Sequence, residues 1–476
     1  MKKFISCCTF VCAMLQCVFA QQNYPVVKTI SSQSTQCITE EQEKEIRQRV
    51  KHNVEMLIAE GRMHAPTNAE KLATLKLGWP LKPSSNFTDS NYYAISNFVD
   101  HNTTSNVLDW NCGTRTYDGH AGTDIALWPY PWLMMDNKMI KVIAAADGII
   151  VDKHDGEFDR NCSANGQPAN YVVLQHSNGY QTIYYHCKKG TITTKAIGAS
   201  VAKGEVLGYV GSSGSSTGVH LHIGLYDNSG NVIDPYKGNC NAIAKSYWLS
   251  QEPYYGEKIH KIMTSLLPII YPYCPNEEQV NENATIPLGM VPYFTVFLSE
   301  IKAGDTVFIK VLKPDNSVWQ TAYYPFANSG SFYYLYWAWY LDPAQPKGTW
   351  KLKTSLGKKN YSYNFTVVDP PAGSPNENYE YQQTSFTDKN LQDDGKMIVS
   401  PNPAKAFTHV QFNCDAGAYK LEVINASGLS VQTKNINVTV GNKTTDINFG
   451  NLPAGIYQLH LFNNKTSIYK TVAVEK

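Results

Sequence analysis

The sequence of 476 residues predicts a modular, mainly β protein with a short helical leader. Aromatic residues make up 12% of the chain, and such rings pack well on pleated sheets. From about residue 106 onward, short alternating or apolar runs are separated by Gly, Asp and Pro, as strands are separated by turns. Charged residues reach only 17% and the formal net charge is +1, so we expect folded domains and no electrostatic footprint for nucleic acid.

The N-terminal part predicts export. Residues 1–20 have a basic start, an apolar run and a small-residue cleavage site ending at Ala20, which is typical of a signal peptide. Residues 21–105 form a leader and possible propeptide, with a helix that Thr39 caps and that carries an apolar stripe over residues 46–58. No later segment is long and apolar enough for a transmembrane span.

The remaining chain divides into four predicted segments. Residues 106–245 hold the candidate catalytic residues among short β-type runs. Residues 265–370 contain about seven short strands, which suggests an immunoglobulin-like β-sandwich. Its segment Ser331–Tyr340 is rich in aromatic rings that either stack on sugars or divide between a core face and an exposed edge. Residues 371–394 are a polar linker, and residues 395–476 form a small C-terminal β-sandwich.

Cysteine usage agrees with export. Of the 11 cysteines, four lie in the signal peptide, and the remaining seven form no CxxC pair, so a cysteine-based zinc site is not expected. Cys162 and Cys187 flank a predicted hairpin and are a candidate disulfide in an oxidising compartment. The odd number leaves at least one free thiol.

Four histidines and one aspartate form the candidate site. His120 and Asp124 lie four residues apart, and His220 and His222 flank Leu221, so a β-strand would point both imidazoles to one face. His186 ends another predicted strand. A catalytic zinc takes three N or O ligands and keeps one position open, which two imidazoles and one carboxylate would satisfy. Any one of these histidines alone is more often an ordinary polar residue; the indication lies in their order and surroundings.

In that order, the motifs resemble those of the lysostaphin/LytM-type zinc metallopeptidases, a peptidoglycan endopeptidase family. They are HAGTD at 120–124, YYH at 184–186 and a Gly/Ser-rich turn into HLH at 211–222. The resemblance implies a LytM-like antiparallel β-sheet and one zinc ion held by His120, Asp124 and His222. It also implies that His186 and His220 are catalytic beside the open position, one of them as general base. The sequence leaves open which of the two takes the proton.

One insertion departs from the family pattern. Residues 128–137, WPYPWLMMDN, replace a short turn after Asp124. They are interpreted either as an aromatic wall along a substrate groove or as a loop packed against the leader.

The tail resembles the C-terminal sorting domain of the type IX secretion system. The matching residues are SPNP at 400–403, LEVINASG at 421–428 and LPAGIY at 452–457. The resemblance implies a Gram-negative source, recognition by that secretion machinery and passage across the outer membrane to the cell surface or the medium. The alternative is a generic carbohydrate-binding or immunoglobulin-like module.

The sequence therefore predicts a secreted zinc metalloendopeptidase that hydrolyses peptidoglycan stem or cross-link peptides through a zinc-activated water. The alternatives are a zinc peptidase acting on Gly-rich proteins, a non-catalytic LytM-like scaffold that binds cell wall, and a surface adhesin whose middle domain is the working part. The leader is further expected to cover the groove until it is removed, with a donor such as an Asn side chain at the open zinc position.

Overall fold

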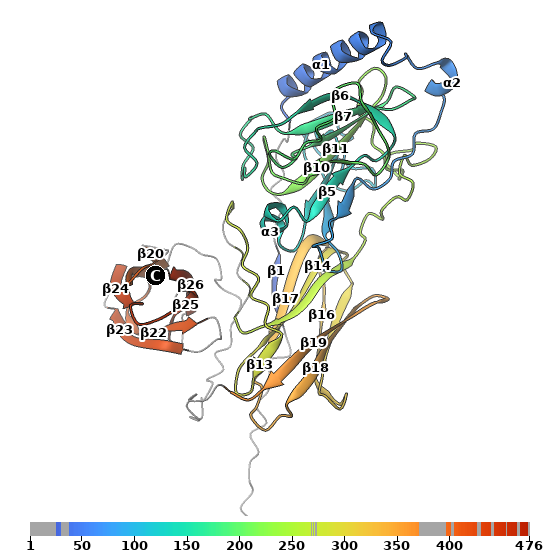
Figure 1. The fold of residues 1–476 in the computed structure, drawn as a ribbon. Coiled ribbons are helices and arrows are strands. Elements are labelled where there is room, and N and C mark those ends of the chain that lie inside the picture. The colour runs from blue at the N-terminus through green and yellow to red at the C-terminus, as the bar shows by residue number, and fades with distance from the viewer. Residues whose placement is uncertain are drawn as a thin grey trace, which may run out of the picture.

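The computed structural model describes residues 25–29, 38–267, 269, 271, 274–370, 397–400, 404–425, 430–438, 442–453, 455–463 and 467–474. The predicted signal peptide and the predicted linker 371–394 lie outside these residues. The described chain is mainly β, as predicted, and strands build all three of its bodies (Figure 1). Among the described residues, no helix has the length and apolarity needed to cross a membrane.

Two antiparallel sheets form the catalytic unit. The larger has the order β3-β4-β11-β8-β7-β6-β9 and the smaller the order β10-β5-β2. The strands of the larger sheet are β3 (Tyr93–Asn97), β4 (Thr123–Leu127), β6 (Gly148–His154), β7 (Tyr171–Gln175), β8 (Gln181–Tyr185), β9 (Ser200–Val201) and β11 (His220–Tyr226). Those of the smaller sheet are β2 (Leu81–Pro83), β5 (Ile140–Ile143) and β10 (Val206–Tyr209). Apolar side chains of both sheets, among them Leu174, Leu207 and Leu221, share one core.

The predicted helix is present as α1 (Glu40–Ala59), and Thr39 caps it through a capping box with Gln42. Its apolar stripe packs on side chains of β6, β7 and β8 in a second core, so the helix covers the sheet at the top of Figure 1. A short helix, α2 (Asn68–Lys71), follows. The helical part of the leader is therefore packed on the catalytic unit.

The later part of the leader belongs to the sheets themselves. β3 pairs with β4 along the edge of the large sheet, and β2 pairs with β5 in the small one. Strands from before and after residue 105, where the division was predicted, therefore lie side by side in the same sheets. Removal of residues 21–105 would take away an edge strand from each of the two sheets, and such processing stays a prediction.

The middle body is a two-sheet β-sandwich, as predicted, and it begins earlier, at residue 258. One sheet has the order β1-β17-β14-β12, and the other β13-β19-β18-β15-β16. The first contains β1 (Val26–Thr29), β12 (Lys258–Ser265), β14 (Tyr293–Ile301) and β17 (Gly330–Ala338). The second contains β13 (Thr285–Pro287), β15 (Thr306–Leu312), β16 (Val318–Pro325), β18 (Gly348–Leu356) and β19 (Lys359–Val368). Its immunoglobulin-like character stays a prediction.

Strand β17 is buried on both faces. Tyr333, Leu335 and Trp337 point into the sandwich core, whereas Phe332, Tyr334 and Tyr336 join a cluster at the contact with the catalytic unit. Of the two interpretations of the strip Ser331–Tyr340, neither stacking on sugars nor an exposed edge fits residues 332–337, because neighbouring side chains cover all six.

The insertion 128–137 provides the other half of that contact. It contains α3 (Pro131–Asp136), and its Trp128 and Tyr130 pack against Phe297 of β14. Trp128 is 2% exposed and Tyr130 is 3% exposed, so these two rings do not line an open groove. The other interpretation, a loop packed against the leader, is correct in part, because Ala94 of β3 belongs to the same cluster. Most residues that contact the insertion there come from the sandwich.

The C-terminal body is a small β-sandwich with a core of its own, as predicted. One sheet has the order β20-β21-β24 and the other β23-β22-β25-β26. The strands are β20 (Met397–Ser400), β21 (Phe407–Asn413), β22 (Gly417–Asn425), β23 (Ser430–Val438), β24 (Asn442–Asn448), β25 (Gly455–Phe462) and β26 (Ser467–Val474).

Two disulfides are formed, Cys112–Cys240 and Cys162–Cys274. The predicted Cys162–Cys187 pairing is wrong. Cys187 follows β8 with its thiol wholly buried in the core, whereas Cys162 lies in the loop between β6 and β7 and meets the connector after β12. Two cysteines that flank a hairpin in the sequence can have side chains that point in different directions, as they do here. Among the described cysteines, Cys187 and Cys414 are free.

Candidate metal centre

Three neighbouring strands place the candidate ligands in one row. On β11, His222 lies opposite Asp124 of β4, and Asp124 in turn lies opposite Asn97 of β3. Because side chains alternate along a strand, His220 and His222 share a face, as predicted. His120 comes from the loop just before β4. Gly122 in that loop has no room for a side chain, since a Cβ there would lie 2.6 Å from the His222 ring.

His120, Asp124 and His222 converge to a triangle of donor atoms. His120 Nε2 lies 3.1 Å from Asp124 Oδ1 and 3.1 Å from His222 Nδ1, and the third side, from His222 Nδ1 to Asp124 Oδ1, measures 3.0 Å. All three residues are buried. A zinc ion with tetrahedral bonds of 2.0–2.1 Å holds its ligand atoms about 3.3 Å apart, so the triangle has nearly the required size.

The hydrogen bonds around the triangle indicate a cation. His120 Nδ1 lies 2.6 Å from the Phe98 carbonyl oxygen, which can only accept, so Nδ1 carries the proton. When Nε2 carries no proton, His120 directs the lone pair of that nitrogen at Asp124 Oδ1. Such an approach is repulsive unless a positive charge lies between the two atoms. The residues present therefore fit a divalent metal ion.

His186 and His220 lie beside the triangle with their ring centroids 4.5 Å apart. His186 donates from Nδ1 to the Ser213 carbonyl oxygen at 2.6 Å, and His220 donates from Nδ1 to the Gly218 carbonyl oxygen at 2.8 Å. Both rings are thus held in the tautomer whose Nε2 can accept a proton. His186 Nε2 is buried and has no hydrogen-bond partner within the described part of the chain. The structure brings together all five residues that the sequence singled out.

His186 is held in an uncommon backbone conformation. Its φ is 65°, in the left-handed region that non-glycine residues rarely adopt. The following residue fixes this turn: Cys187 donates its amide to the Asn170 carbonyl oxygen at 3.0 Å, and Asn170 Nδ2 donates to the Cys187 carbonyl oxygen at 3.1 Å. Buried hydrogen bonds therefore aim the ring at the site.

Burial sets the protonation states of this centre. It lowers the pKa of His186 well below its ordinary value, helped by repulsion from His220 and His222, and it lowers the pKa of His222 too. For Asp124 burial acts to raise the pKa, but the charges and hydrogen bonds of His120, His220 and His222 together outweigh it and hold that pKa well below the ordinary value. A neutral His222 beside an ionised Asp124 is the combination in which these two groups bind a metal ion.

Sequence reasoning missed the residues that orient the five. Asn97 donates from Nδ2 to Asp124 Oδ2 at 3.0 Å, on the oxygen that points away from the histidines. An asparagine of the leader therefore does lie at the site, but it contacts the ligand carboxylate. Its signal was available only through strand pairing, because Asn97 lies in a segment predicted to be mostly loop. The carbonyl groups of Phe98 and Ser213 belong to the main chain, so the residue types at these positions do not reveal the contacts they make with the histidines.

Comparison with known proteins identifies two parts of the chain. Residues 119–235 match Peptidase family M23, and residues 399–475 match the secretion system C-terminal sorting domain. The chain therefore carries an M23 metallopeptidase domain of the LytM/lysostaphin type and a sorting domain, and both predicted resemblances are confirmed. The sorting domain indicates export across the outer membrane to the cell surface or the medium.

The curated relatives match a limited part of the chain. The DD-carboxypeptidase/endopeptidase Mpg of Neisseria meningitidis is 41% identical over 81 residues, which are 17% of this chain and 16% of that protein. The peptidoglycan DD-endopeptidase ShyA of Vibrio cholerae is 34% identical over 126 residues, which are 26% of this chain and 24% of that protein. The chain thus spans a quarter or less of the length of these relatives. The catalytic domain of lysostaphin from Staphylococcus simulans aligns over 32% of this chain and 96% of its own, with 21% identity and a TM-score of 0.18.

Proposed function

We propose that this chain, with its M23 domain and sorting tail, is an exported zinc endopeptidase that cuts stem or cross-link peptides of peptidoglycan. The observation that carries the proposal is the triangle of His120, Asp124 and His222, flanked by two histidines whose tautomers are fixed. The peptidoglycan endopeptidases among the relatives supply the substrate class.

The proposed chemistry divides between the metal and the protein. A zinc ion held by His120, Asp124 and His222 supplies Lewis acidity at the scissile carbonyl and acidifies a water. His186 or His220 accepts the proton of the attacking water at Nε2, because its Nδ1 is already committed to a carbonyl group. The imidazolium formed in this way carries the proton at Nε2, from which it donates to the oxyanion that develops in the transition state and then to the leaving amine.

The non-catalytic alternatives fit the site less well. A scaffold that only binds cell wall has no need of one carboxylate and four imidazoles gathered in a buried cluster, since such groups are costly to desolvate. A surface adhesin that works through the aromatic strip of the middle domain loses its support, because the rings of residues 332–337 are covered.

Metal analysis and product analysis together test the proposal. Purified protein is expected to contain one zinc per chain and to release cleaved peptides from muropeptides of defined cross-link, identified by mass spectrometry. His120→Ala and His222→Ala are each expected to abolish both properties. Stoichiometric zinc in the double variant would refute the ligand assignment. Cleavage of Gly-rich proteins with intact muropeptides would replace the substrate class and keep the enzyme.

A further inference from the structure

The loop between β6 and β7 pairs with the Ser-rich loop that precedes His220. Isolated β-bridges join Arg160 to Ser212 and Ser163 to Ser216. Asn161 donates its amide to the Ser212 carbonyl oxygen at 3.0 Å, and Ser212 donates its amide to the Asp159 carbonyl oxygen at 3.2 Å. The position of the Ser-rich loop therefore depends on the position of residues 159–163.

Hydroxyl groups carry this dependence to the catalytic histidine. Ser212 Oγ donates to the Asn161 carbonyl oxygen and lies 2.8 Å from Ser216 Oγ. Ser216 Oγ lies 2.9 Å from the Gly218 carbonyl oxygen, the same atom that accepts from His220 Nδ1. Ser212 and Ser216 are both buried. A shift of Asn161 would thus displace the acceptor that orients the His220 ring.

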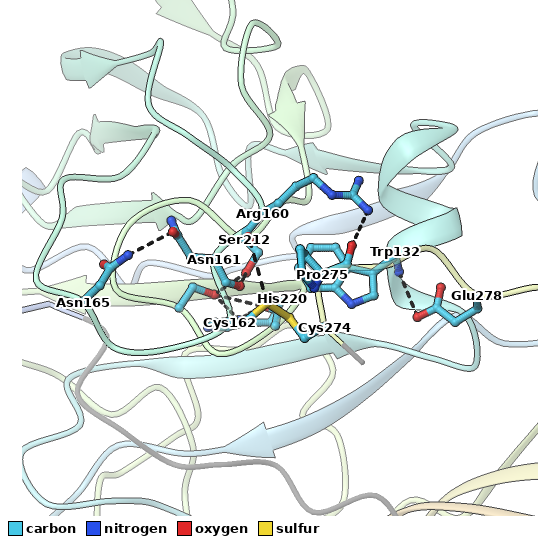
Figure 2. The surroundings of a disulfide bond; sticks show 12 residues. Trp132, Arg160, Asn161, Cys162, Asn165, Ser212, His220, Cys274, Pro275 and Glu278 are labelled. Atoms are coloured by element: carbon cyan, nitrogen blue, oxygen red, sulfur yellow. Dashed lines mark hydrogen bonds between the residues drawn. A yellow bond between two sulfur atoms is a disulfide. The ribbon is translucent and has the colours of Figure 1, made fainter. Parts of the chain in front are cut away.

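The β6–β7 loop is in turn fixed to the sandwich side of the molecule. Cys162 is bonded to Cys274 in the connector between β12 and β13. Next to it, Arg160 donates to the Pro275 carbonyl oxygen, pairs with Asp136 of α3 and lies over the Trp132 ring. Figure 2 shows the disulfide with Arg160, Trp132 and Pro275, together with Asn161, Ser212 and His220. Asp155 and Asp159 also anchor the loop, since they accept from the amides of residues 190, 192 and 189, but these contacts lie on its other side, and only Cys162 ties it covalently to the connector.

We infer that the Cys162–Cys274 disulfide is a positioning cross-link for His220, through which the connector of the sandwich domain fixes the geometry of the catalytic centre. The inference rests on the proposed function, because it assigns His220 a role in proton transfer. Without the cross-link the β6–β7 loop keeps only its hydrogen bonds and the Arg160 contacts, so the Ser-rich loop samples more positions. Small misplacements of a catalytic group cost much of its effect on rate.

The second disulfide provides a matched control. Cys112–Cys240 closes 128 residues and Cys162–Cys274 closes 112, so in the chain-entropy model the loss of either costs nearly the same stability. Cys240 donates its amide to the Trp110 carbonyl oxygen, and this disulfide joins two segments other than the β6–β7 loop and the Ser-rich loop. Replacing each pair with serine therefore separates loss of stability from loss of catalytic geometry.

The experiment compares the full-length protein with its C162S/C274S and C112S/C240S variants. For C162S/C274S we expect kcat to fall about 10- to 100-fold with KM and zinc content unchanged. For C112S/C240S we expect kcat within about twofold of the parent value, at a similar loss of thermal stability. Equal kcat losses in the two variants, or loss of zinc from C162S/C274S, would overturn the inference.

A second readout does not depend on hydrolysis. In protein labelled with 15N-histidine, the His220 Nδ1 proton, assigned with His220→Ala, is expected to exchange with solvent at least tenfold faster in C162S/C274S than in C112S/C240S. Unchanged protection in C162S/C274S would contradict the positioning role even where no muropeptide is cleaved. A protein that shows the difference in exchange but cleaves no peptide would instead refute the proposed function and leave the structural coupling in place.

Discussion

The hydrogen bond from Asn97 to Asp124 gives a direct measure of how the edge strand supports metal binding. Asn97 is 7% exposed and Asp124 is 2% exposed, and the bond between them, 3.0 Å long, ends on an ionised carboxylate. Hydrogen bonds to charged groups contribute about 1.5–3 kcal/mol, more than bonds between neutral groups. In Asn97→Ala, Asp124 Oδ2 loses this donor, and the carboxylate can rotate away from the position that faces both histidines.

We expect Asn97→Ala to raise the dissociation constant for zinc about 10- to 100-fold, which is the usual effect of removing a residue that supports a metal ligand. That range corresponds to about 1.4–2.7 kcal/mol and agrees with the value expected for the hydrogen bond. Competition with a chromogenic chelator at fixed pH measures the constant, and a denaturation curve checks that the variant is folded.

Ser96→Ala is the matched control, because Ser96 is equally buried on the same strand but lies 3.4 Å from the main-chain carbonyl oxygen of Asp124. Its zinc affinity should stay within about threefold of the parent value, since the two contacts that are lost, to the Asp124 carbonyl oxygen and from Asn97 Nδ2, are long and join neutral groups. An unchanged dissociation constant in Asn97→Ala would refute the reasoning, as would an equal loss in both variants.

Three further outcomes follow. His186→Ala and His220→Ala should each keep zinc but lose about 10²- to 10⁴-fold in kcat, and near-normal turnover in either would show that residue to be structural. Burial raises the pKa of Glu278 from 4.5 to about 7, so the folded state holds a proton that the unfolded chain releases, and the free energy of unfolding should fall by about 3 kcal/mol as pH rises through this range. Urea denaturation from pH 4 to 8 measures the slope, which Glu278→Gln should flatten; an unaltered slope assigns it to other groups. Deletion of residues 395–476 should leave an active peptidase in the periplasm, and normal release to the medium would contradict a sorting role.

The sequence was most informative where chemistry and local geometry coincide. His220 and His222 occupy alternate positions of one strand, so their shared face followed from the period of a β-strand, and the apolar run 182–186 placed His186 at the end of another. These rules are local, and the structure brings the predicted residues together. The role of each residue was implied by resemblance and stays a proposal.

Long-range pairing was out of reach. Asn97 reaches Asp124 only because β3 joins β4, and nothing in the polar segment around residues 84–92 predicts that pairing. The disulfide partner of Cys162 lies 112 residues away in the sequence, so the choice of the nearer Cys187 was wrong. Trp128 packs against Phe297, and an aromatic insertion read alone does not show which domain covers it. In each case the sequence did not show which distant segment of the chain contacts the residue.

Strand β17 limits how this protein can be rearranged by evolution or in the laboratory. Its two faces pack into two different cores, so the M23 domain and the sandwich cannot be recombined separately with other domains without exposing one of these cores. A recombination event that transferred the catalytic unit alone would leave Phe332, Tyr334 and Tyr336 as a contiguous apolar patch in water, a surface that favours aggregation. The smallest segment that can be transferred with both cores still buried therefore contains the catalytic domain and the sandwich. The C-terminal body has a core of its own and can be joined to other enzymes.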